Sequence, residues 1–326
     1  MMPFPTLSRI SARARSMMIA RTACVVILVA MLLTVFGCSA DSSQSSTDPD
    51  STGSSAETSR QAEVLTAQLA ATGYHVPAMI PVPGEEPYDA NGIRRWDYGK
   101  ELGLQYLPLE ICNDAIQFHK AYHQVPEGKR RFDGYEDEFL RACGWLLENA
   151  EVWEAGGLLL LNRHDLTRLG NTTPGPWPSA LTQGRTAKVM ALAYEWTKDE
   201  RYAEAARKFL RPVMADMRQG GLTYTEGSYS WFEEYPVPEP DHVLNGHQSV
   251  ILDMMFVAEA IDDAEIESWA RKGSESLVRA LPDFELAERM AWALSYEVGS
   301  TFASPQPVVN PALNYDRIHI LYLKQL

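Results

Sequence analysis

The feature that most constrains the fold of this chain is a recurrence with a period of about 65 residues. Two Gly-Gly pairs, at 156–157 and 220–221, lie 64 residues apart, and each opens a run of apolar, aromatic or β-branched residues. Ala193 and Ala258 lie 65 residues apart, near the ends of two segments with helical apolar spacing. A recurrence of this length is typical of architectures in which each unit packs against its neighbours. We therefore expect units of helix, helix and hairpin.

The apolar spacing defines the expected fold class. Apolar residues at i, i+3, i+4 and i+7 in 189–196, and a similar stripe in 250–261, predict two helices. Hairpins are expected near 152–162, 220–234 and 289–298. Together these elements predict a mainly α fold, a partial (α/α) toroid or barrel with short β-hairpins between helix pairs, over residues 105–326.

The first 37 residues have the pattern of a targeting segment. Four arginines precede an apolar run of 14 residues, which is short for a membrane span. Small Gly37 before Cys38 resembles a bacterial lipoprotein cleavage site, so residues 1–37 are predicted to be a signal peptide and Cys38 the lipid attachment site. An uncleaved anchor is the alternative. Either way the chain is expected to be exported and tethered to a bacterial membrane, on the periplasmic or outer surface.

Two further segments precede the helical region. Residues 38–60 are rich in Ser, Thr and Asp and have almost no apolar content, so they are predicted to be a disordered tether. Residues 61–104 contain several prolines and are predicted to be an extended lead-in to the domain at 105–326.

The charge of the chain excludes some partners. The full sequence carries a net charge of −14. Removal of the signal peptide would leave 25 basic and 43 acidic residues, a charge of −18. This balance argues against nucleic acid and against broad adhesion to anionic membranes. A polyanionic ligand would need a local basic patch, for which the chain offers Arg163, His164, Arg168, Arg185 and Lys188.

Cys112 and Cys143 remain after removal of the signal peptide, and both fall on apolar faces of expected helices. An exported protein can form a disulfide, and two neighbouring buried thiols explain the pattern equally well. The sequence leaves this choice open.

Residues 231–246 contain the most closely spaced candidate catalytic side chains. Glu233, Glu234 and Tyr235 are followed by three prolines, and Asn245 with Gly246 opens an apolar-periodic helix. Adjacent acid and phenol groups on a rigid turn suit proton transfer beside a sugar-sized ligand. The other interpretation is an acidic strand end followed by a structured loop.

These motifs resemble the C-terminal domain of D-glucuronyl C5-epimerases. The resemblance rests on Glu-Glu-Tyr-Pro and Val-Leu-Asn-Gly in 233–246, and on the Trp, Ser-Ala and Gln-Gly segment at 176–185. It continues through Thr-Lys-Asp at 197–199, the Tyr296 segment at 295–298 and the Tyr315 segment at 315–320. The similarity covers roughly residues 90–326.

The resemblance implies a helical barrel that inverts C5 of D-glucuronate to L-iduronate within a polysaccharide or oligosaccharide, such as a heparan-like glycan. It implies proton abstraction and re-protonation without a cofactor, and an anionic, uronic-acid-containing glycan as the partner. The sequence itself contains no nucleotide-binding fingerprint. A homodimer is left open.

The resemblance also assigns roles to individual residues. Glu234 with Tyr235 would act on one face of the sugar, Tyr315 on the other, and Tyr296 would orient the carboxylate or share the proton relay. Each tyrosine has a structural alternative as a packed aromatic. The implied substrate-binding residues are Trp177, Gln183, Arg185 and Asn245. The last three have helix capping as the alternative.

No metal site is predicted, because the histidines are scattered. His119 and His123 are spaced i, i+4 on an expected helix, and a solvated face is the expected interpretation.

Two other functions remain open. One is a polysaccharide lyase on the same scaffold, and the other is a non-catalytic glycan-binding lipoprotein. Three departures from the family pattern bear on this choice. They are Arg185 in place of Gln, Asp316 in place of His, and 297–298 as Glu-Val in place of Asp-Leu.

Overall fold

The computed structural model describes residues 80–130, 132–168, 171–238, 240–284, 319 and 322–326. The chain divides into two compact units, Met1–Gly73 and Tyr74–Leu326, and every described residue belongs to the second. The predicted signal peptide with Cys38, the tether and the hairpin near 289–298 lie outside the described residues. Within the described part of the chain, no helix is both long and apolar enough to cross a membrane.

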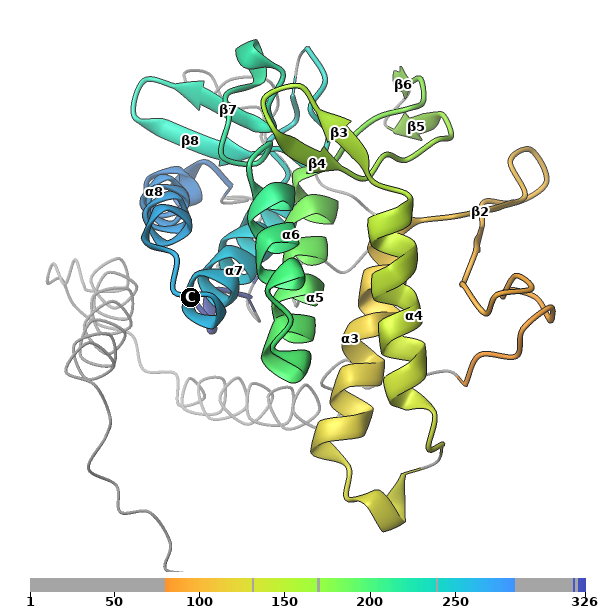
Figure 1. Ribbon diagram of the computed structural model, residues 1–326. Coiled ribbons are helices and arrows are strands. Elements are labelled where there is room, and N and C mark those ends of the chain that lie inside the picture. Colours follow the sequence, from red (N-terminus) through yellow and green to blue (C-terminus); the bar gives the residue numbers. More distant parts are fainter. Residues whose placement is uncertain (1–79, 131, 169–170, 239, 285–318, 320–321) are drawn as a thin grey trace, which may run out of the picture. The chain divides into compact units, whose positions relative to one another are not determined.

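Among the described residues of the second unit, three helix pairs follow one another (Figure 1). They are α3 (Pro108–Gln124) with α4 (Tyr135–Glu148), α5 (Ala180–Thr197) with α6 (Glu200–Leu210), and α7 (Leu244–Ala260) with α8 (Ala264–Ala280). The first helices of the pairs also pack on one another, α3 on α5 and α5 on α7. They therefore form an inner row, and α5 is accordingly buried around most of its circumference, whereas α6 is buried along one face. This is the predicted mainly α arrangement of packed helix pairs.

Short antiparallel hairpins connect the pairs at one end of the helices (Figure 1). They are β3 (Glu151–Trp153) with β4 (Gly157–Leu159), β5 (Leu166–Arg168) with β6 (Asn171–Thr173), and β7 (Thr223–Glu226) with β8 (Tyr229–Phe232). The hairpins expected near 152–162 and 220–234 are confirmed. The β5–β6 hairpin is a finding that the sequence pattern did not predict.

The recurring Gly-Gly pairs have a shared structural reason. The first glycine of each pair has a positive φ, +87° at Gly156 and +76° at Gly220, a conformation that disfavours other residues. The second glycine lies against neighbouring backbone. A Cβ at Gly157 would lie 3.0 Å from the Lys208 carbonyl oxygen, and one at Gly221 would overlap the carbonyl of Ala215. The pairs therefore let each hairpin pack closely onto the region around the end of α6.

Three of the described α-helices begin at a polar capping residue. Ser179 accepts from the amide of Thr182 at the start of α5, and Asp199 and Asp263 cap α6 and α8 in the same way. In α7 the N-cap residue is Val243, which provides no side-chain cap, and α3 and α4 likewise begin without one. The first amides of α7 therefore lack a cap from the position that normally supplies one.

The segment before α3 runs over α3 and α4. It contains turns and a two-residue ladder of β1 (Trp96–Asp97) with β2 (Leu104–Gln105). Ile93 packs into the core, and Arg94 donates to Asp114 on α3 at 3.0 Å. Cys112 and Cys143 are buried free thiols, so the structure has the two-thiol arrangement that the sequence left open.

Candidate active site

The loop after β8 is anchored by the residue that precedes Glu234. The amide of Glu233 donates to the Leu222 carbonyl at 2.9 Å, and its carbonyl accepts from the amide of Ala180, the first residue of α5, at 3.0 Å. Its carboxylate Oε1 lies 2.6 Å from Nδ1 of His242, and both residues are fully buried. Glu233 therefore joins the hairpin, α5 and the residues leading into α7.

Glu234 lies against the first turn of α7. Its Oε2 is 2.6 Å from the position that a Cβ on Gly246 would occupy, and its own Cβ is 3.0 Å from that position. This close approach requires glycine at 246. The amino end of a helix favours negative charge, and α7 has no capping side chain of its own at Val243. The location therefore suits an ionised carboxylate.

Aromatic rings extend from this loop toward the segment before α3. The ring of Tyr235 lies 5.6 Å from that of Trp177, measured between centroids. The indole Nε1 of Trp177 donates to the His164 carbonyl at 3.1 Å, and the His164 ring lies 4.2 Å from that of Tyr98. Burial lowers the pKa of His164, which favours its neutral form despite the neighbouring Asp165. The structure thus brings the rings of Trp177 and Tyr235 together.

Gln183 is held by backbone. Its Oε1 accepts from the amide of Leu160 at 3.2 Å, and its Nε2 donates to the Leu160 carbonyl at 2.9 Å. The side chain is fully buried, so it fixes the chain after β4 to α5. This arrangement favours a structural role. Asn245 differs, because its Oδ1 is buried and has no hydrogen-bond partner among the described residues.

Arg185 lies between the inner helices, one and a half turns into α5. Its Nε donates to Oδ2 of Asp253 on α7 at 2.6 Å, and its Nη1 donates to Asn113 on α3 at 2.9 Å. A third, short hydrogen bond joins its Nη2 to Ser249. Lys188 donates to the second oxygen of Asp253 at 2.9 Å. The Arg185 guanidinium therefore forms an ion pair with the buried carboxylate of Asp253.

The charges in this cluster stabilise one another. Burial opposes ionisation of both Arg185 and Asp253. Their mutual attraction outweighs burial, so the pKa of Arg185 is raised and that of Asp253, which also pairs with Lys188, is lowered. Of the other residues proposed for a basic patch, Arg163 is exposed and pairs with Glu151 at 2.6 Å, while His164 is buried.

Tyr296 and Tyr315 lie outside the described residues, and so does Asp316. The geometry therefore bears on the Glu234 and Tyr235 half of the predicted site.

The described residues contain no group of three His, Cys, Asp or Glu side chains placed to hold a metal ion. His119 and His123 are not simply a solvated face. Their rings lie 4.4 Å apart, and the half-buried His119 lies 5.5 Å from Phe139 and 5.6 Å from Trp196. Burial lowers the pKa of His119 to about 4. The apolar residues that surround it come from α4 and α5, which the spacing along α3 does not reveal.

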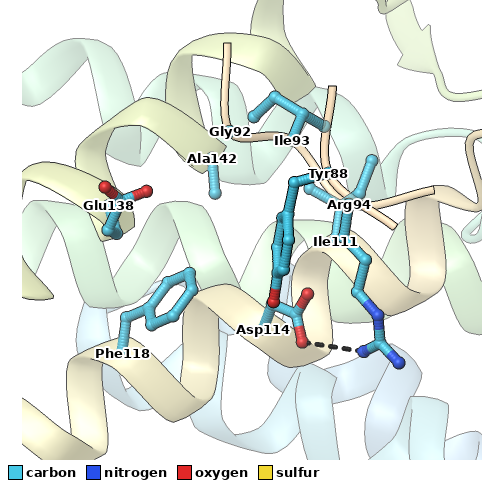
Figure 2. Close-up of a pocket in the computed structure, with 9 residues that line it drawn as sticks. All are labelled: Tyr88, Gly92, Ile93, Arg94, Ile111, Asp114, Phe118, Glu138 and Ala142. Carbon is cyan, nitrogen blue, oxygen red and sulfur yellow. Dashed lines mark hydrogen bonds and ion pairs between the residues drawn. The ribbon is translucent and has the colours of Figure 1, made fainter. Parts of the chain in front are cut away.

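A small cavity between the lead-in, α3 and α4 is lined by none of the predicted site residues (Figure 2). Tyr88, Asp114 and Glu138 contribute oxygen atoms to its wall, and Arg94 pairs with Asp114 there. Burial raises the pKa of Asp114 to about 6, although Arg94 acts in the opposite direction. The cavity is a feature of the packing between lead-in and helices, separate from the loop of Glu234.

Comparison with known proteins places these motifs in a family. Residues 162–326 match the model of the D-glucuronyl C5-epimerase C-terminus. The chain belongs to this family. The matched region contains all four predicted catalytic residues of the epimerase pattern, Glu234, Tyr235, Tyr296 and Tyr315.

Two relatives support the match over parts of their length. An uncharacterised protein of Methanocaldococcus jannaschii is 28% identical over 201 residues, which are 58% of this chain and 65% of that protein. The D-glucuronyl C5-epimerase of Caenorhabditis elegans is 28% identical over 117 residues, 36% of this chain and 19% of that protein. The chain thus spans less than two thirds of either relative. Among solved structures, the endo-β-1,4-glucanase CMCax of Acetobacter xylinum aligns over 67% of this chain and 72% of its own, with 13% identity and a TM-score of 0.43.

Proposed function

We propose that this protein is an epimerase that inverts C5 of D-glucuronate residues to L-iduronate in an anionic polysaccharide or oligosaccharide. The observation that carries the proposal is the position of Glu234, held against the first turn of α7. Tyr235 follows Glu234 in the chain, and the Tyr235 ring lies 5.6 Å from that of Trp177. Family membership supports carbohydrate epimerase chemistry, and the relative from C. elegans bears the name of this activity.

In this proposal Glu234 takes the C5 proton, which is acidified by the adjacent sugar carboxylate. Its carboxylate becomes a carboxylic acid as it does so. Tyr315 then delivers its phenolic proton to the opposite face of the ring and becomes a phenolate. Exchange with solvent returns both groups to their starting states. Tyr235 supports the Glu234 face, and Tyr296 orients the sugar carboxylate.

The test is incubation of the full chain with glucuronans and heparosan-like oligosaccharides in heavy water, followed by NMR at C5. We expect deuterium at C5 together with L-iduronate. Glu234→Gln and Tyr315→Phe should each lower the rate by about 10²–10⁴-fold while glycan binding is retained. Glu154→Gln, which removes an exposed carboxylate from the β3–β4 turn, is the matched control and should leave the rate unchanged.

The competing functions give different outcomes in the same samples. A lyase would expel the C4 substituent and form an unsaturated sugar that absorbs in the ultraviolet. A glycan-binding protein would bind the oligosaccharide without deuterium uptake at C5. Either result would overturn the epimerase proposal.

We also propose that the chain is a lipoprotein whose mature N-terminus is a lipidated Cys38. The support is the sequence pattern of basic, apolar and small residues before Cys38. Mass spectrometry of the membrane fraction should detect a diacylated Cys38, and Cys38→Ser should release the protein from membranes. An intact Met1 on the membrane-bound protein would contradict the proposal.

A further inference from the structure

The buried pair of Glu233 and His242 spans the two ends of the loop that carries Glu234 and Tyr235. Glu233 follows β8 directly, and His242 lies two residues before the start of α7. The 2.6 Å contact between Oε1 and Nδ1 joins these ends through side chains that are almost completely excluded from solvent. The loop is therefore closed by a side-chain contact at its base.

The backbone at both ends of the loop indicates that this contact holds the loop in place. His242 has a φ of +53°, a left-handed conformation that is uncommon for residues other than glycine, although Asn, Asp and His adopt it more often than the rest. The side chain of this histidine is held by contacts with the Tyr224 ring at 4.7 Å and with Glu233. At the other end, both backbone groups of Glu233 are hydrogen-bonded, to Leu222 and to Ala180. The backbone of Glu233 is thus held by two hydrogen bonds, and its carboxylate in turn holds His242.

The consequence falls on the next residue in the chain. Glu234 has Oε2 only 2.6 Å from the Cβ position of Gly246, so its carboxylate lies directly against the first turn of α7. A shift of about 1 Å in a reacting group can lower a rate by roughly 10²-fold. Loss of the contact at the loop base would allow such a shift, because the loop residues after Glu233 would lose their connection to His242.

We propose that Glu233 and His242 are positioning residues, which hold the loop so that the Glu234 carboxylate stays over the first turn of α7. This inference rests on the proposed epimerase function for its kinetic consequences. It assigns no proton transfer to either residue, because both are buried and Glu233 faces His242.

Four variants test the pair by steady-state kinetics. Glu233→Ala should lower kcat by about 10²-fold with KM within about threefold of wild type. Glu233→Gln keeps an oxygen that accepts from Nδ1–H and should restore at least about tenfold of that loss. His242→Asn keeps a donor and tolerates the positive φ, so it should behave like Glu233→Gln. His242→Gly tolerates the positive φ but removes the ring that contacts Glu233, so it should behave like Glu233→Ala.

A second measurement separates this proposal from the proposed function. Hydrogen exchange followed by mass spectrometry, on peptides that cover 233–246, should increase in Glu233→Ala and His242→Gly and remain at the wild-type level in Glu154→Gln. If the wild type inverts no glucuronate but these peptides still open in the variants, the epimerase proposal fails and the role in holding the loop stands.

The positioning role is overturned if Glu233→Ala exchanges and turns over like wild type. It is also overturned if His242→Gly retains full kcat, because the ring would then be dispensable. If Glu233→Ala does not fold, His242→Asn and His242→Gly carry the same comparison, since only the first keeps a side chain at 242 that can donate to Glu233.

Discussion

Oε2 of Glu234 lies 2.6 Å from the point at which a side chain on Gly246 would begin. The glycine in the Asn-Gly pair at the start of α7 is therefore a requirement of the residue that faces it, 12 positions earlier in the chain. Neither residue needs the other for local secondary structure. The relationship exists because the loop after β8 folds back onto the helix that follows it.

Gly246→Ala is expected to displace Glu234 and lower kcat by about 10²-fold, because the added methyl group would overlap the carboxylate. The fold should persist, since alanine is a better helix former than glycine. Steady-state kinetics with thermal unfolding would check both statements. Gly144→Ala is the matched control, because nothing lies within 4 Å of its Cβ position in α4. Turnover of Gly246→Ala at the wild-type rate would contradict the placement of Glu234.

Arg185→Gln introduces the residue that the family pattern has at this position and leaves Asp253 with Lys188 alone. Since Asp253 is almost completely buried, we expect a loss of about 2–4 kcal/mol in the free energy of unfolding, measured with urea. The double variant with Asp253→Asn should recover part of that loss, because no buried carboxylate remains. A normal stability combined with weakened glycan binding would instead support the original prediction that Arg185 binds substrate.

Burial of His247 is expected to make the protein less stable in acid. Burial lowers its pKa to about 3, and the Gly273 carbonyl only partly opposes this. The folded state therefore binds fewer protons than the unfolded state below pH 6.5, and stability falls as the pH drops from about 6.5 toward 3. Each such group contributes a slope of about 1.4 kcal/mol per pH unit. Urea titrations between pH 7.5 and 5 should show a shallower slope for His247→Gln, and an unchanged slope would count against the prediction.

Burial of Asp114 is expected to have the opposite effect, a loss of stability as the pH rises. Burial raises its pKa to about 6, so its contribution to stability is present below the unfolded value near 3.8 and is lost as the pH rises through about 6. Asp114→Asn should therefore stabilise the protein at pH 8 by about 1–3 kcal/mol, and it should have little effect near pH 4. Denaturant titrations at these two pH values provide the measurement. An effect of the same size at both would show that the carboxylate charge is not its cause.

The sequence predicted the parts of the fold that depend on local pattern. The stripes at 189–196 and 250–261 correspond to α5 and α7, because these helices face apolar neighbours along much of their length. The Gly-Gly pairs predicted two hairpins because a positive φ and a close backbone approach both require glycine. The β5–β6 hairpin has no such pair, and its three-residue strands are too short to show alternation.

The parts of the candidate site that the sequence did not predict depend on contacts between distant segments. Arg185 and Asp253 are 68 positions apart, so only the packing of α5 on α7 brings them together. Glu233 and His242 pair because the loop between β8 and α7 closes on itself, a contact that the local residue pattern does not indicate. Trp177 and Tyr235, by contrast, were named from the family pattern, and their rings are in contact.

The missing cap at the start of α7 has an evolutionary consequence. A polar residue at an N-cap typically adds about 1 kcal/mol of stability, and Ser179, Asp199 and Asp263 occupy that position in α5, α6 and α8. Val243 is instead almost completely buried, so a polar residue there would exchange apolar burial for the cap. An acidic side chain at 243 would also place a second negative charge at the helix end that Glu234 faces. Selection for stability and selection for the proposed activity therefore both favour an apolar residue at this position.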